Sequence, residues 1–185
     1  LTPAWRPDGR ELLVTSYRAG RPEIWSFRLA DRAFRRLGRV PNAMGGVYSP
    51  DGGRIAFTAS EGGNSDVYVM NADGSGARRL TTHAALDLSP AWSPDGKRIV
   101  FVSDRAGTPQ LYVMSADGSD ARRLTFQGNY NQTPQWSPRG DLIAFTARDE
   151  RKVFDVFVVS PDSGKIARVT QNQGATNEEP SWAPN

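Results

Sequence analysis

One phrase recurs along this chain, and its spacing limits the possible folds more than any other feature. The stretch AWSPDGKRIVFVSD occupies residues 91–104. Similar stretches occupy residues 4–17, 47–60 and 135–148, and a further copy begins at 181–185. Their central prolines stand 43 to 46 residues apart, at Pro7, Pro50, Pro94, Pro138 and Pro184. A repeat of about 40–50 residues is typical of β-propeller blades.

Each repeat contains four short segments of strand character that are separated by turns. In the third repeat these segments are residues 89–93, 98–103, 110–115 and 121–125. Asp-Gly pairs follow the first and third segments. Such pairs favour hairpin turns, because glycine accepts a positive φ and aspartate bonds its own backbone. We therefore predict four antiparallel strands in each repeat.

The second and third segments are apolar without interruption, as in IVFV at 99–102 and LYVM at 111–114. A sheet with one face in water alternates apolar and polar residues, so these strands are expected to lie between two other sheets. Radially stacked sheets meet this requirement. The sequence predicts an all-β fold, a β-propeller of four-stranded antiparallel blades at approximately 1–38, 45–81, 89–125 and 133–170, with 180–185 as the start of a fifth.

The composition argues against several kinds of chemistry. The 185 residues include no cysteine and one histidine, His83, which lies in a loop. The mean hydropathy is −0.54, and no apolar run approaches the length of a membrane span. Neither a G-x-S-x-G nucleophile motif nor a phosphate-binding loop occurs. We predict a protein that is not an enzyme, has no catalytic residues and needs no cofactor.

The net charge of +3 comes largely from arginine pairs on the predicted outer strands, at 35–36, 78–79 and 122–123. Charged residues on outer strands prevent edge-to-edge pairing of sheets. Nucleic-acid binding would require a denser basic stripe with interleaved aromatic residues. We therefore predict a solvated outer rim and no nucleic-acid partner.

The loops that lead into the predicted inner strands do not follow the repeat. They are VPNAMGG at 40–46, THAALDLS at 82–89, QGNYNQT at 127–133 and QGATNEE at 173–179. They converge on one mouth of the central channel, and variable loops on a rigid scaffold commonly bind a partner. The alternative is that they only tie the blades together. The candidate partner-binding residues are Asn42, Met44, His83, Asp87, Leu88, Asn129, Tyr130, Asn131, Gln132, Asn177, Glu178 and Glu179.

Two of these residues, Tyr130 and Met44, are the predicted buried anchors of a protein interface with a polar rim. Asp87, Glu178 and Glu179 are weaker candidates for a Ca²⁺ site in the channel, because Ca²⁺ prefers oxygen ligands. No other metal site is predicted.

The repeat at 90–125, and the joint RLTFQGNYNQTPQWSPRGDLIAFTA at 123–147, resemble the β-propeller repeats of the TolB family, a WD40-like repeat type called PD40. The resemblance implies a ring of six blades, of which about four lie in this chain, behind an N-terminal α/β domain. Asn131-Gln132 keep an Asn-Gln pair of the family, whereas Asn42 stands where the family has a histidine.

The resemblance also implies a function. Members are periplasmic components of the Tol–Pal system that support outer-membrane integrity and cell division. The propeller mouth is expected to dock the peptidoglycan-associated lipoprotein Pal. Contact with TolA is implied only for an N-terminal region outside this sequence.

Two other functions stay open. Similar repeats occur in the propellers of prolyl-oligopeptidase-like and tricorn-like peptidases, so an accessory propeller that gates a peptidase is one alternative. An excised fragment without retained function is the other. An incomplete ring exposes two apolar blade faces. We therefore expect either self-association through the end blades or a smaller closed ring in which residues 180–182 complete the first blade.

Overall fold

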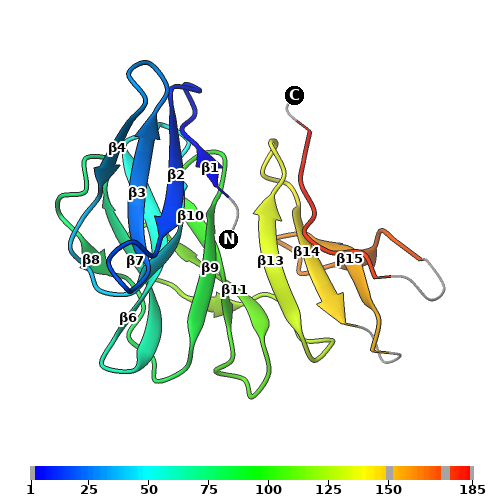
Figure 1. The fold of residues 1–185 in the computed structure, drawn as a ribbon. Helices are drawn as coiled ribbons and strands as arrows, with labels where there is room; N and C mark the ends of the chain where they lie inside the picture. Colours follow the sequence, from blue (N-terminus) through cyan, green and yellow to red (C-terminus); the bar gives the residue numbers. More distant parts are fainter. Residues whose placement is uncertain (1–2, 149–151, 172–175, 184–185) are drawn as a thin grey trace.

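The computed structural model describes residues 3–148, 152–171 and 176–183. Their strands form four sheets, and each sheet consists of four consecutive strands that pair antiparallel. Figure 1 shows the sheets side by side around a common centre, from the blue N-terminal sheet to the yellow and orange last sheet. The predicted all-β propeller fold with four-stranded blades is confirmed. The described residues contain no helix that could cross a membrane.

The strands of each blade follow one another from the centre to the outer edge. The first blade holds β1 (Ala4–Trp5), β2 (Glu11–Ser16), β3 (Glu23–Arg28) and β4 (Ala33–Arg36). The second holds β5 (Ala43–Tyr48), β6 (Arg54–Glu61), β7 (Asn64–Asn71) and β8 (Arg78–Arg79). The third holds β9 (Asp87–Trp92), β10 (Arg98–Ser103), β11 (Gln110–Ser115) and β12 (Arg122–Arg123). The fourth holds β13 (Asn131–Trp136), β14 (Ile143–Arg148), β15 (Phe154–Val159) and β16 (Ile166–Arg168).

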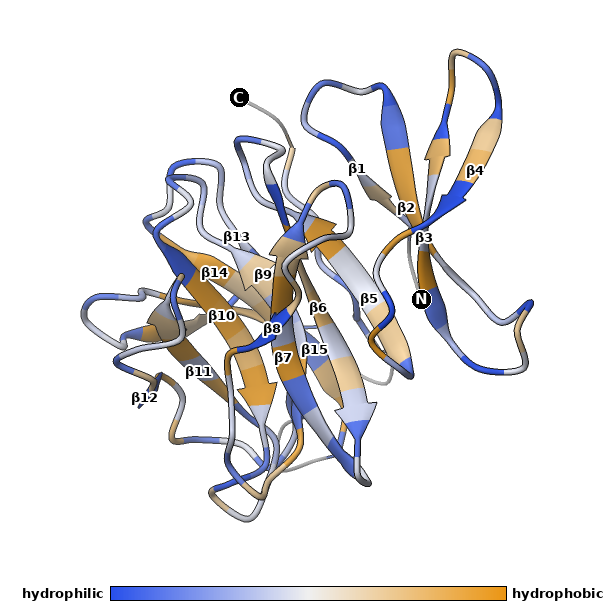
Figure 2. Ribbon diagram, turned by 90° about the vertical axis from the view of Figure 1, so that its left-hand side faces the viewer, coloured by the Kyte–Doolittle hydropathy of each residue, from blue (hydrophilic) through white to orange (hydrophobic). Residues whose placement is uncertain are grey.

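Neighbouring blades pack face to face through apolar clusters, one at each junction. The second strands β6, β10 and β14 supply Phe57, Phe101 and Phe145, whose side chains are almost completely buried. Figure 2 shows apolar residues, in orange, along β6, β7 and β10 in the middle of the blades. Burial of one phenylalanine side chain contributes about 1.5–3 kcal/mol. This explains why the second strands are apolar on both faces.

The recurring Ser-Pro-Asp-Gly turn is held by its own side chains. In the third blade, Ser93 Oγ donates to Asp95 Oδ1 at 2.5 Å and accepts the N–H of Arg98 at 2.9 Å. Gly96 has φ 68°, a value that glycine adopts without strain. Hydrogen bonds from the Ser93 hydroxyl and the Lys97 backbone lower the pKa of Asp95. The repeated phrase is therefore a self-contained structural turn.

A bulge in the inner strand binds the second blade to the first and the third blade to the second. The bulge residues Gly45 and Ser89 have φ values of 65° and 53°. The backbone N–H of Gly45 donates to Thr15 Oγ1 at 3.1 Å, and that of Ser89 donates to Thr58 Oγ1 at 3.2 Å. A threonine on the second strand of one blade thus satisfies a backbone donor on the inner strand of the next.

Residues 176–183 continue this pattern beside the fourth blade. Glu179 has φ 54°, and its N–H donates to Thr146 Oγ1 at 3.0 Å. Trp182 Nε1 donates to the carbonyl oxygen of Gln135, on β13, at 3.0 Å. The first blade already has four strands, with β1 as its innermost one. The expectation that residues 180–182 complete this blade is therefore wrong.

No other sheet of the described residues packs on one face of the first blade. Leu12 is paired with Trp5 and Phe27, and Phe27 is paired with Phe34, so these apolar side chains share that face. Trp5 is 58% exposed, and Phe34 is also exposed. Leu13 points to the opposite face and joins the cluster at the first junction.

The Asp-Gly turns between the third and fourth strands approach the preceding blade closely. A Cβ atom on Gly74 would lie 2.5 Å from the backbone nitrogen of Gly38, and one on Gly118 would lie 3.0 Å from the carbonyl oxygen of Leu80. Only glycine fits at position 74, whereas at position 118 the backbone of Leu80 would have to shift by a few tenths of an ångström. Gly74 is therefore required for blade packing as well as for the turn.

Candidate partner-binding site

The two faces of the propeller follow the repeat to different degrees. The turn face carries the Pro-Asp-Gly and Asp-Gly turns. The mouth face, on the opposite side, carries the loops that lead from each outer strand to the next inner strand (Figure 1). Between the inner strands lies a cavity of about 560 Å³, lined by residues of β1, β5, β9, β13 and the segment 179–181. A partner at the mouth face would cover one end of this channel.

Four of the predicted site residues occupy equivalent positions across the channel mouth. Met44, Leu88 and Gln132 are the second residues of β5, β9 and β13, and Glu178 holds the same place in the segment beside the fourth blade. Glu178 is exposed and the other three are half-buried. Gln132 Nε2 lies 3.5 Å from Glu178 Oε2 and donates to it. The structure thus brings these residues into one row, as the repeat spacing predicts.

Asp87 is not available to a partner on this surface. It is the first residue of β9, and its side chain is 0% exposed. Arg105 Nη2 donates to both carboxylate oxygens of Asp87, at 3.0 and 2.9 Å. The guanidinium of Arg105 also lies over the rings of Phe101 and Tyr112. Asp87 therefore serves to hold the third blade together.

Asn131 is likewise a buried structural residue, with 1% of its surface exposed. Its Nδ2 donates to Gln110 Oε1 at 2.9 Å and to Thr125 Oγ1 at 3.0 Å. Because Asn131 begins β13 while the other two residues belong to the third blade, these bonds join two blades. The alternative role predicted for the loop residues, that of tying blades together, applies to Asn131, whereas the Asp87 side chain is bonded within the third blade.

Asn177 repeats this contact one blade further on. Its Nδ2 donates to Asp155 Oδ1 at 3.2 Å, and its backbone N–H donates to the carbonyl oxygen of Phe154 at 2.8 Å. Burial alone would raise the pKa of Asp155, but hydrogen bonds from Thr170, Arg168 and Asn177 outweigh it and lower that pKa. The ionised carboxylate therefore fixes the segment 176–183 to the fourth blade.

The other predicted residues lie on or near the surface of the mouth face. Tyr130 is 38% exposed, and its ring meets that of Phe154 edge-on with centroids 5.8 Å apart. Asn129 and His83 are exposed, and Asn42 is half-buried with its Nδ2 donating to the carbonyl oxygen of Ser60. Tyr130 is thus held in place by packing but keeps a free edge, as an interface anchor requires.

Sequence reasoning missed three exposed apolar residues on the same face: Tyr17, Leu86 and Phe126. Phe126 is the most exposed of these, at 71%. The sequence marks Phe126 as a departure from the repeat, because the polar residues Thr82 and Gln171 occupy the equivalent position after the outer strands of the second and fourth blades. Exposed aromatic and aliphatic side chains around a polar mouth are typical of a protein-binding surface.

The three candidate Ca²⁺ ligands do not gather into one site. Within residues 3–148, 152–171 and 176–183, no group of three or more His, Cys, Asp or Glu side chains could hold a metal ion. The carboxylate of Asp87 is paired with Arg105, while Glu178 is exposed beside Gln132.

The arginine pairs on the outer strands are mostly exposed, as expected for a solvated rim, but they also make specific contacts. Arg78 Nη1 donates to the carbonyl oxygen of Asp117 at 3.0 Å, and Arg122 Nη2 donates to that of Pro161 at 2.6 Å, each in the next blade. An arginine on three outer strands pairs with a buried carboxylate: Arg36 with Glu23 at 2.8 Å, Arg79 with Asp66 at 2.6 Å, and Arg168 with Asp155. These arginines therefore connect strands and blades while most of them stay exposed on the rim.

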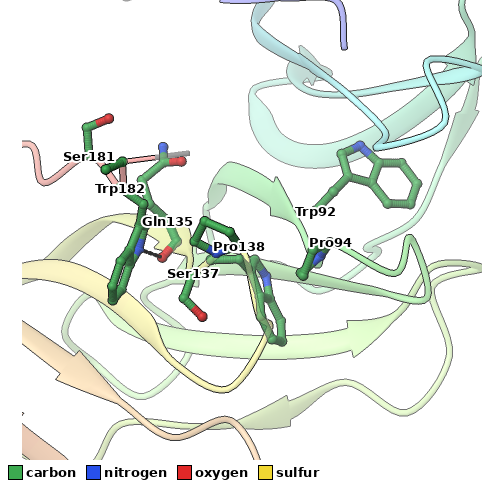
Figure 3. A pocket seen from close by; sticks show the side chains of 9 residues that line it. Trp92, Pro94, Gln135, Ser137, Pro138, Ser181 and Trp182 are labelled. Atoms are coloured by element: carbon green, nitrogen blue, oxygen red, sulfur yellow. Dashed lines mark hydrogen bonds between the residues drawn. The ribbon is translucent and has the colours of Figure 1, made fainter. Parts of the chain in front are cut away.

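A second, more open pocket of about 330 Å³ lies near the Pro-Asp-Gly turns, between the third blade, the fourth blade and the segment 181–183. Figure 3 shows the Trp182 indole bonded to the Gln135 backbone on one side of it, and Trp92 with Pro94 on the other. The guanidinium of Arg54 lies 4.6 Å from the Trp92 ring centroid. These indoles serve to pack successive blades.

Comparison with known proteins identifies what this chain is similar to. All of residues 1–185 match the family model described as PD40, TolB beta propeller domain. Over 172 residues the chain is 80% identical to the Tol-Pal system protein TolB of Anaeromyxobacter dehalogenans strain 2CP-C, a match that covers 93% of this chain and 40% of the relative. The chain therefore spans well under half the length of this relative.

Solved structures show the same likeness. TolB from Acinetobacter baumannii superposes with a TM-score of 0.83 at 31% identity, covering 92% of this chain and 43% of that one. A putative TolB from Agrobacterium tumefaciens gives 0.82 at 26% identity, covering 92% and 61%. A puromycin hydrolase gives 0.73 at 16% identity, with 90% and 28% covered. This last likeness concerns the fold alone.

Proposed function

Because the chain belongs to the TolB β-propeller family, over its whole length, we propose that it is a non-catalytic binding module of the Tol–Pal system. In this proposal its mouth face docks the lipoprotein Pal in the periplasm. The module thereby links parts of the cell envelope and supports outer-membrane integrity and cell division. Contact with TolA belongs to regions of the whole protein that precede the propeller.

The observation that carries this proposal is the contrast between the two faces. The turn face repeats the same self-bonded turns, whereas the mouth face exposes Tyr130, Leu86 and Phe126 around a half-buried row that includes Met44 and Gln132. Apolar anchors surrounded by polar groups are the usual composition of a specific protein interface. The rigid blades behind this surface keep it preformed, which lowers the entropic cost of binding.

The direct test is the binding of the lipid-free periplasmic part of Pal from Anaeromyxobacter dehalogenans, measured by isothermal titration calorimetry. We expect Tyr130→Ala to weaken binding by more than about 1 kcal/mol, or at least fivefold, because truncation of a central aromatic anchor costs this much. The Tyr130 ring contacts Phe154, so circular dichroism and thermal unfolding must show that the variant remains folded.

The matched control is Arg139→Ala, whose side chain is 76% exposed on the turn face. It should leave the affinity unchanged. Equal losses in the two variants would contradict docking at the mouth face, and failure of the unaltered chain to bind Pal would contradict the proposed partner.

A further inference from the structure

The outer strands of the second and fourth blades share one arrangement around an arginine. Arg79 Nε donates to the carbonyl oxygen of Thr81 at 2.7 Å, and its Nη2 lies 2.6 Å from Asp66 Oδ2. Arg168 pairs in the same way with Asp155. In both blades a buried carboxylate at the start of the third strand neutralises the arginine.

The third blade keeps the arginine but lacks the carboxylate. Arg123 Nε donates to the carbonyl oxygen of Thr125 at 2.6 Å, yet Gln110 stands where Asp66 and Asp155 stand in their blades. The Gln110 amide is fully used, because its Oε1 accepts from Thr125 and Asn131 and its Nε2 donates to the Gly128 carbonyl. Among the residues that the structure describes, no carboxylate pairs with Arg123, so its Nη groups keep unused donors.

An exposed aromatic ring lies beside this uncompensated charge. Phe126 is 71% exposed, and the Arg123 guanidinium lies 4.8 Å from its ring centroid. Thr82 and Gln171 occupy the equivalent position in the second and fourth blades. Two departures from the repeat therefore meet at one arginine: Gln110 leaves its charge unpaired, and Phe126 gives it an exposed apolar neighbour.

We propose that Arg123 and Phe126 form a binding site at the outer edge of the mouth face. Its ligand is an acidic side chain of a protein partner that lies next to an apolar side chain of the same partner. A guanidinium with free Nη groups binds a carboxylate in a planar, two-point geometry. The exposed Phe126 ring takes the apolar neighbour. Arginine and aromatic residues are both enriched at protein interfaces.

The position of the site extends the mouth surface outward. The loop 126–130 begins at this site and ends at the channel mouth, where it exposes Tyr130. The site shares Phe126 with the mouth face that is proposed to dock Pal, and it is tested without Pal, so that the two proposals can fail independently.

The test is an NMR titration of the whole chain with arginine side chains labelled with ¹⁵N. The probe is the peptide acetyl-Leu-Glu-Leu-amide, and acetyl-Leu-Gln-Leu-amide is its neutral match. We expect the glutamate peptide to shift the Arg123 Nε–Hε and Phe126 ring resonances saturably and to leave Arg139, on the turn face, unmoved. The neutral peptide should bind at least about fivefold more weakly. Added salt should weaken binding of the glutamate peptide, as expected for a partly exposed ion pair.

Two variants separate the site from general charge effects. Phe126→Thr copies the residue of the second blade at an exposed position, and Gln110→Glu supplies the internal carboxylate that the other blades have. Each variant should weaken binding of the glutamate peptide at least about fivefold, while Arg139→Gln should leave this binding unchanged. If Gln110→Glu unfolds the chain, Phe126→Thr still tests the proposal. The proposal is overturned by the absence of a saturable shift at Arg123, by equal binding of both peptides, or by unchanged binding in Phe126→Thr.

Discussion

The close approach of Gly74 to the first blade gives the sharpest stability prediction. Gly74 and Gly107 have almost the same backbone conformation, with φ values of 87° and 88°. A Cβ on Gly74 would meet Gly38 N at 2.5 Å and Leu37 Cα at 3.1 Å, whereas one on Gly107 would meet nothing within 4 Å. Gly107→Ala therefore measures the backbone cost alone, and Gly74→Ala adds the clash between blades.

An alanine in the left-handed region costs about 1–2 kcal/mol, which is the loss of unfolding free energy expected for Gly107→Ala. Overpacking against a fixed neighbour adds about 1–3 kcal/mol, because Gly38 is backbone and cannot rotate away. Gly74→Ala should thus lose about 2–5 kcal/mol. Urea denaturation followed by tryptophan fluorescence measures both values. Losses that agree within about 0.5 kcal/mol, the scatter of neutral surface changes, would refute the argument that this glycine is needed for blade packing.

Three further predictions concern charge and exposed surface. The pKa of Asp95 is lowered in the folded chain. The stabilising effect of its carboxylate is therefore complete above the unfolded pKa of about 3.9 and is lost as the pH falls through the folded value. Asp95→Asn should flatten the acid side of a profile of unfolding free energy against pH. Asp87→Ala should lower the free energy of unfolding, measured by urea denaturation, by about 3–5 kcal/mol, because it leaves Arg105 without its counter-ion. The control Asp162→Ala removes a side chain that is 79% exposed and should lower it by only about 0–1 kcal/mol. The uncovered apolar face of the first blade should make the chain self-associate, and Trp5→Ser should reduce this; a concentration-independent monomer mass in analytical ultracentrifugation would contradict that expectation.

The repeat made the blades predictable, because each strand type has its own residue pattern. The period located four sheets, and the uninterrupted apolar segments identified the second and third strands that are buried on both faces. Turn chemistry was equally visible, since the Asp-Gly pairs coincide with turns between paired strands. These features depend on local sequence, so they need no knowledge of how blades sit against one another.

The site was only partly predictable, because exposure depends on contacts between blades. The inner strands begin at Ala43, Asp87 and Asn131, two residues before the blade boundaries at 45, 89 and 133 that the sequence suggested. This shift places Asp87 and Asn131 inside the sheet, where polar side chains must be paired. Phe126 could have been noticed as a departure from the repeat, but its exposure and its contact with Arg123 follow only from the packed structure.

The hydroxyl-to-bulge contact between Thr58 and Ser89 has a consequence for how the molecule unfolds. Such contacts, like that of Arg122 with Pro161, join each blade to the next one along the chain. Stability then behaves as a sum of unit terms and nearest-neighbour couplings, as in a linear array of repeats. Melting is expected to start at the end blades and advance one blade at a time when a coupling is weakened. Amide exchange should accordingly be slowest in β6 and β10, at the middle of the array.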